Sequence, residues 1–100
     1  MVKVKQLRSP TSGRDIPNQF VITEETNYGH RKYFQSYGSI IAYMDVDDTG
    51  SYTVLDKTYW DYSRTTGKYR NQFLGEDIKT TRKKIKSGEY ILADLNNTYN

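Results

Sequence analysis

The chain has 100 residues and a formal net charge of +3, with 35% hydrophobic, 27% charged and 14% aromatic side chains. This length suits one domain with one core, and the chain is too rich in apolar residues to be disordered. The absence of cysteine excludes a disulfide scaffold, thiol catalysis and thiolate metal sites. We therefore expect a single domain over residues 1–100, with residues 96–100 as a frayed tail.

The longest uninterrupted apolar stretch covers only residues 40–44, which is far too short to span a membrane. The first residues alternate between valine and lysine, unlike the apolar run of a signal peptide. We expect a cytoplasmic protein with no membrane partner and no cofactor. Its mild positive charge favours anionic partners without requiring them.

The same alternation in residues 2–7 predicts a short edge strand whose lysines face water. Turn-forming residues between two arginines indicate a loop over residues 8–14. Segments rich in β-branched and aromatic residues, separated by turn signals, predict the next strands at residues 19–26, 31–37, 39–46 and 52–55. Their short connections favour an antiparallel meander.

Two short helices are predicted next. The first is capped by Thr65 or Thr66 and ends at Gly75.

The second helix begins at Asp77 or Thr80 and ends at Gly88. Residues 90–95 then predict a last, well-buried strand. The fold class is therefore α+β, with an antiparallel β-sheet meander of about five to six strands, two short C-terminal helices and a final strand.

The most distinctive segment covers residues 59–74, which hold five aromatic side chains and three cations. Aromatic rings that stack on a base and cations that hold its phosphate need this mixture. The plain alternative is that Trp60, Phe73 and Leu74 pack the core. The predicted ligand-binding residues of this segment are Tyr62, Arg64, Lys68, Tyr69, Arg70 and Asn71.

Two further basic features have functional and plain interpretations. The loop at residues 8–14 lacks P-loop spacing, but it offers hydroxyls and two guanidinium groups to an anion. From it we predict ligand contacts by Arg8, Ser12 and Arg14; a solvated connection is the alternative. A helical stripe is formed by Lys79, Arg82, Lys83 and Lys86. It could follow a phosphate backbone, although a solvated helix face is commoner.

Metal binding and catalysis have weak support. Residues 45–56 faintly imitate a calcium loop, but strands flank them, so we predict a hairpin turn and no metal ligands. The single histidine, His30, lies in a predicted turn, and common hydrolase motifs are missing. We therefore expect no catalytic residues.

Several segments resemble a family of small uncharacterised proteins of tailed bacteriophages that infect Gram-positive hosts, a domain of unknown function. The segments that carry the resemblance are residues 8–14 (RSPTSGR), 17–20 (PNQF), 33–37 (YFQSY), 60–63 (WDYS), 65–71 (TTGKYRN) and 84–90 (KIKSGEY). The resemblance implies a context in which small accessory proteins bind phage DNA, a host protein or a nucleotide signal of bacterial immunity.

Our first hypothesis is a non-enzymatic accessory protein that binds a nucleotide or nucleic acid, including a counter-defence protein that sequesters a nucleotide immune signal. The second is a protein–protein inhibitor or assembly factor that acts on a host or phage protein. The third is a small hydrolase. Homo-oligomer formation remains open under each hypothesis.

Overall fold

The computed structural model describes residues 1–96, so the predicted tail lies outside the described residues except for Asn96. The elements follow in the order β1 (Val2–Arg8), β2 (Asp15–Glu25), β3 (Gly29–Ser36), β4 (Ser39–Asp47), β5 (Gly50–Asp56), α1 (Arg64–Leu74), α2 (Ile78–Ser87) and β6 (Tyr90–Ala93). All the strands form one sheet in the spatial order β1-β2-β3-β4-β5-β6. Neighbours are antiparallel except for the parallel pair β5 and β6. The predicted α+β class and the meander are confirmed.

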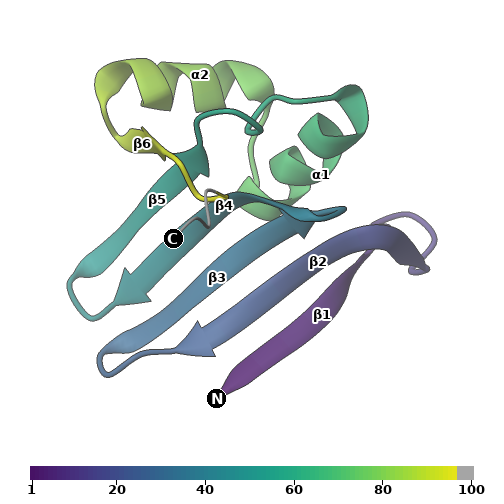
Figure 1. Ribbon diagram of the computed structural model, residues 1–100, viewed down its shortest axis with the longest axis horizontal. Coiled ribbons are helices and arrows are strands. Elements are labelled where there is room, and N and C mark those ends of the chain that lie inside the picture. The colour runs from purple at the N-terminus through teal and green to yellow at the C-terminus, as the bar shows by residue number, and fades with distance from the viewer. Residues whose placement is uncertain (97–100) are drawn as a thin grey trace.

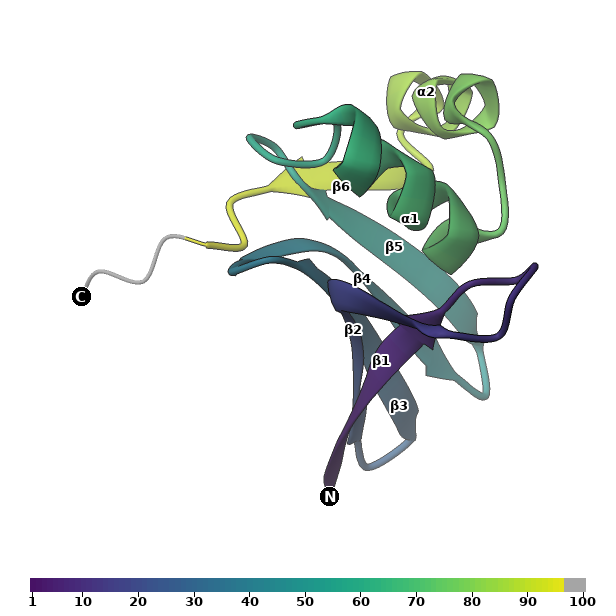
Figure 2. The ribbon, with the colours of Figure 1, turned by 90° about the vertical axis from the view of Figure 1, so that its right-hand side faces the viewer.

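Both helices lie on one side of the sheet (Figure 1). They sit near β5, β6 and one end of the meander, while β1 and its neighbours extend beyond them (Figure 2). That face of the sheet therefore has a covered part and an uncovered part. Within residues 1–96, no helix is long and apolar enough to cross a membrane.

The core lies between the covered part of the sheet and the helices. Its central cluster consists of Ala42, Leu55 and Tyr90. The ring of Phe34 in β3 stacks on Phe73 of α1, with centroids 5.6 Å apart. Partly buried residues pack around the cluster, namely Trp60, Phe73, Leu74 and Ile85. The predicted core role of Trp60, Phe73 and Leu74 is confirmed. Full burial of such a side chain stabilises a fold by roughly 1.5–3 kcal/mol, so these partly buried residues contribute less than that each.

The turn between β4 and β5 is held by its own side chains. The carboxylate of Asp47 accepts hydrogen bonds from the backbone N–H and the hydroxyl of Thr49, at 2.8 and 2.6 Å. Gly50 follows with a φ of 137°, which L side chains rarely adopt. The hairpin predicted in place of a calcium loop is confirmed.

Capping side chains and glycines determine where the two helices begin and end. Gly75 and Gly88 end the helices in the left-handed conformation, and Asp77 caps α2, as predicted. The prediction that Thr65 or Thr66 caps α1 is wrong, because the Ser63 hydroxyl accepts the Thr66 N–H at 3.1 Å.

The last strand differs from its prediction. It covers only Tyr90–Ala93 and occupies the edge of the sheet next to β5. Only Tyr90 is buried, while Ile91 and Leu92 are 52% and 41% exposed. An apolar run has the same pattern on an edge as in the middle of a sheet, so the predicted burial was wrong.

Candidate functional site

A cavity of about 340 Å³ opens between the β3–β4 turn and the start of α1. Its walls come from two separate parts of the chain, residues 36–41 and residues 59–66, which the fold brings together. We call it the tyrosine pocket. Its lining residues are Ser36, Tyr37, Ser39, Ile41, Tyr59, Tyr62, Ser63 and Thr66.

One wall is the connection between β5 and α1. The buried carboxylate of Asp56 accepts the N–H groups of Thr58 and Tyr59, at 3.0 and 2.7 Å, and so fixes the chain as it leaves β5. The rings of Tyr59 and Tyr62 then meet edge to face, with centroids 5.3 Å apart. Tyr62 is 68% exposed, so most of its ring surface remains open to a ligand.

The opposite wall contains Tyr37 in an unusual backbone conformation. Its φ is 55°, although a two-residue hairpin turn favours glycine at such a position and here Gly38 follows it instead. The Tyr37 N–H donates to the carbonyl of Asn18 at 2.7 Å, and Asn18 has a φ of 66°. A bulky residue in this region costs roughly 1–2 kcal/mol, and such strain concentrates at functional sites.

The inner end of the pocket is polar and buried. The hydroxyls of Ser36 and Thr66 are hydrogen bonded at 3.1 Å, which ties β3 to α1. Gln19, the register partner of Ser36 on β2, is fully buried. Neither its amide nitrogen nor its amide oxygen finds a partner among residues 1–96. A buried polar group without a partner costs roughly 1–3 kcal/mol. The two amide atoms of Gln19 at this end of the sheet are therefore able to form further hydrogen bonds.

The pocket lining contains no charged side chain. Arg64 is exposed directly after the pocket-lining Ser63, and Lys68 is exposed one turn further along α1. The first turn of α1 contains no acidic residue, and the nearby carboxylate of Asp61 is paired with Arg70 and Arg82 at 3.1 and 3.6 Å, so no acidic side chain of the helix itself offsets the partial positive charge of its N-terminus. The arrangement suits a ligand with a flat uncharged part and an anionic part.

The structure brings together part of the predicted ligand-binding set. Tyr62 lines the pocket, and Arg64 follows directly after the capping serine. The ammonium of Lys68 lies 5.3 Å from the ring centroid of Tyr69, which is half-buried.

Arg70 has a different role. It is only 1% exposed, and its guanidinium donates to the Trp60 carbonyl at 2.7 Å. It also donates to Asp61 at 3.1 Å and to the Asn71 side chain at 2.9 Å. These hydrogen bonds hold the guanidinium inside the protein, so we leave Arg70 and Asn71 out of the candidate site.

The loop that carries Arg8, Ser12 and Arg14 lies elsewhere. Arg8 forms an exposed ion pair with Asp15 at 3.3 Å, and its carbonyl accepts the side-chain amide of Gln72 at 2.9 Å. The Ser12 hydroxyl accepts the Arg14 N–H at 3.3 Å. The loop therefore meets α1 near the C-terminal end of the helix, about 12 Å or more along its axis from Ser63. The loop and Tyr62 do not close one pocket.

Sequence reasoning missed several lining residues, because they lie outside the aromatic-basic segment or were treated as packing. One local signal was available at Tyr37, because tyrosine stands where a two-residue turn usually has asparagine, aspartate or glycine. The missed residues are Ser36, Tyr37, Ser39, Ile41, Tyr59, Ser63 and Thr66, the last of which was predicted only as a helix cap.

Fold and site together define a small α+β domain with a tyrosine- and hydroxyl-lined pocket beside a helix N-terminus. The chain belongs to the family of unknown function DUF8033, whose model matches residues 2–89. No curated protein and no solved structure matches the chain.

Proposed function

We propose that the protein is a non-enzymatic binding module that holds a nucleoside or nucleotide in the tyrosine pocket. The pocket itself is the observation that carries the proposal. Its volume of about 340 Å³ lies at the lower end of the range of small-molecule sites, roughly 300–1,000 Å³, and suits a single nucleoside. Stacking on a tyrosine contributes roughly 1–3 kcal/mol for each base, and the serine and threonine hydroxyls can bond a sugar or a base edge.

The phosphate of such a ligand would lie at the mouth of the pocket. Arg64, next to the pocket-lining Ser63, would supply positive charge there, and the N-terminal end of α1 would supply backbone N–H groups. The base is then selected by aromatic surface and the phosphate by charge.

Binding without turnover is favoured by the chemistry of the lining. Its eight residues include no carboxylate, histidine or lysine. General acid–base catalysis near neutral pH uses such groups, held within hydrogen-bond reach of the substrate. A site of stacking rings and hydroxyls is better suited to holding a molecule than to cleaving it.

For the biological setting, we propose a phage accessory protein that acts in the cytoplasm of the infected host and sequesters a nucleotide immune signal. The resemblance of the segments in residues 8–14, 33–37 and 60–71 to small phage proteins supports this setting. A nucleotide-sized pocket without catalytic groups fits sequestration.

The test is calorimetric titration with AMP, ATP and cyclic dinucleotides at low salt. Tyr62→Ala should weaken binding by about tenfold or more, as expected for the loss of a stacking partner. Tyr28→Ala is the matched control, because Tyr28 is also highly exposed but lies in the β2–β3 turn. If the parent protein binds none of these ligands, or if both variants lose affinity equally, the proposal fails.

A second candidate function is protein binding through the sheet face opposite the helices. Tyr33 precedes the helix-facing Phe34, so it lies on that opposite face. Its ring centroid is 5.8 Å from that of Tyr43, which is 6.3 Å from that of Tyr52. Arg31 lies 4.4 Å from the Tyr43 ring centroid. Tyrosine and arginine are common interface anchors, which favours this alternative.

The second candidate has its own test. A host or phage protein should be retained stoichiometrically from nuclease-treated lysate, and the retention should be lost with Tyr52→Ala but kept with Tyr28→Ala. Retention that is unaffected by Tyr52→Ala would contradict the use of this face.

A further inference from the structure

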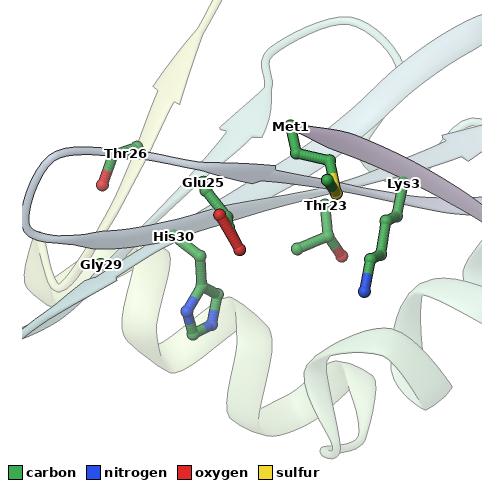
Figure 3. Close-up of a pocket in the computed structure, with 7 residues that line it drawn as sticks. All are labelled: Met1, Lys3, Thr23, Glu25, Thr26, Gly29 and His30. Carbon is green, nitrogen blue, oxygen red and sulfur yellow. The ribbon is translucent and has the colours of Figure 1, made fainter.

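The uncovered part of the helix-facing side of the sheet carries a group of lysines. Lys32 lies two residues before Phe34 on β3, so its side chain is on the same side as the helices. The register aligns it with Thr23 on β2 and Lys3 on β1. Lys5 lies on the same face, two residues after Lys3. Figure 3 shows Lys3 and Thr23 projecting from neighbouring strands toward one side.

These lysines line a concave surface. A cavity of about 430 Å³ is bounded by Lys3, Lys5 and Lys32, with Arg8 at one end and Gln72 of α1 on its wall. A second cavity of about 300 Å³, drawn in Figure 3, shares Lys3 and Thr23 with the first. The two cavities are therefore adjacent, and we call the first one the lysine trough.

Within residues 1–96, Lys3, Lys5 and Lys32 form no ion pair. Strand geometry places the Cα atoms of Lys3 and Lys5 about 7 Å apart, and those of Lys3 and Lys32 about 10 Å apart across two strand spacings. These separations are close to the Debye length of about 8–10 Å at ordinary salt, so the charges repel one another. The nearby carboxylate, Glu25, lines only the second cavity. The trough thus holds a local excess of positive charge.

The protection of an exposed sheet edge by lysine side chains explains only some of the lysines in the trough. Lysines on an edge strand hinder pairing with another chain, which accounts for Lys3 and Lys5 on β1. It does not account for Lys32, because β3 is an inner strand of the sheet. Lys32 is half-buried on the helix-facing side of an inner strand, so an anion in the trough would supply the charge partner that it lacks among residues 1–96.

We propose that the lysine trough binds a single strand of nucleic acid. Its backbone phosphates would contact Lys3, Lys5 and Lys32, while Val21 and the aliphatic lysine stems provide apolar surface for the bases. The trough lies at the Gln72 end of α1 and the tyrosine pocket lies at the Thr66 end, so this site does not depend on the nucleotide pocket.

The test is fluorescence anisotropy with a labelled oligothymidylate of about 12 nucleotides, within the usual site size of a single-strand-binding domain. Three phosphate contacts predict that log K falls with log salt with a slope of about −2, because each contact on a single strand contributes about −0.7. The double variant Lys3→Gln/Lys32→Gln should reduce the slope to about −0.7. At roughly 50 mM salt each lost contact should weaken binding about eightfold.

The control is Lys57→Gln/Lys86→Gln, which removes the same charge at exposed positions outside the trough. It should keep the slope and lose less than threefold in affinity. No binding of the oligonucleotide by the parent at low salt overturns the proposal, as does an equal loss in the control. Equally tight, Lys32-dependent binding of polyglutamate would also overturn it by assigning the trough to an acidic polypeptide.

Titration with mononucleotides distinguishes the lysine trough from the tyrosine pocket. The trough variant should bind mononucleotides within twofold of the parent, whereas Tyr62→Ala should not. The same parent protein and variants therefore show separately whether the proposal for the trough or the proposal for the tyrosine pocket fails.

Discussion

Two groups of polar side chains beside α1 differ in how they are bonded. In the first, the guanidinium of the buried Arg70 donates hydrogen bonds to Trp60, Asp61 and Asn71. In the second, tyrosines and serines line an open pocket at the N-terminal end of the helix, with the strained Tyr37 on its wall. One aromatic-basic segment thus contains a closed cluster that stabilises the fold and an open cluster available to a ligand. Three hydrogen bonds inside the protein indicate a stabilising role for Arg70, even though its Nε lacks a partner among residues 1–96, whereas backbone strain beside an open pocket indicates function.

The largest expected effect is that of Arg70→Met, which tests whether Arg70 stabilises the fold or binds the ligand. The variant keeps most of the side-chain volume, but it leaves the Trp60 carbonyl and Asp61 without their buried donor. We expect the free energy of unfolding to fall by about 3 kcal/mol, measured by urea denaturation. Nucleotide affinity of the folded fraction should remain within about threefold. A normal stability with lost binding would move Arg70 back into the ligand site.

The variant Glu76→Gln tests a second cluster of hydrogen-bonded side chains, which lies between the two helices and β6. Its carboxylate accepts hydrogen bonds from Thr81 at 2.6 Å, Lys84 at 2.8 Å and Tyr90 at 2.9 Å. Burial raises the pKa of Glu76, but these hydrogen bonds outweigh burial and leave the pKa below its ordinary value of 4.5. Glu76→Gln should therefore lower the free energy of unfolding at neutral pH by about 2 kcal/mol.

The pH dependence of Glu76→Gln follows from the direction of that shift. A lowered pKa in the folded chain gives stability that is present above the ordinary value of 4.5 and is lost as the pH falls through the folded value. The difference in unfolding free energy between the parent and Glu76→Gln should therefore shrink below about pH 4.5. A constant difference from pH 7 to pH 3 would contradict this assignment.

Ser63→Ala tests the open end of the helix. Loss of the N-cap should cost about 1 kcal/mol of unfolding free energy. The same change should weaken nucleotide binding, because Ser63 also lines the pocket. Asp77→Ala is the matched control, since it removes the N-cap of α2 away from the pocket. It should lower the unfolding free energy similarly and leave affinity unchanged; equal affinity losses would indicate a general effect of stability.

The smallest expected effect on stability is at Tyr37. Glycine adopts a φ of 55° without strain, so Tyr37→Gly should raise the unfolding free energy by about 0.5 kcal/mol after the added chain entropy is considered. The variant should also bind nucleotides more weakly, because one wall of the pocket is lost. Asn18→Gly relaxes the partner residue without removing a ring and should retain binding. A destabilised Tyr37→Gly would show that Tyr37 serves packing.

Much of the fold was predictable because its signals are local. Gly75 and Gly88 end helices in a conformation that favours glycine, and Asp77 caps α2 with its own side chain. Alternating valine and lysine identified the edge strand β1. These features depend on residues close together in the chain, so the sequence contains them directly.

The predictions that failed depend on contacts between distant residues. Ile91 and Leu92 are apolar, yet they are exposed because β6 pairs only with β5 and closes the sheet at an edge. Thr66 was a plausible cap, but it is buried against Ser36, thirty residues earlier in the chain.

The sequence by itself determined the α+β class, the meander, most turns and the composition of the segment at residues 59–74. Tertiary structure decided which residues of that segment are buried and which are open. Arg70 and Arg64 look alike in the sequence, but a helix of 3.6 residues per turn directs the first inward and leaves the second at the surface. The lysine trough likewise exists only because strand pairing aligns Lys3 with Lys32, a relationship fixed by register rather than by proximity in the chain.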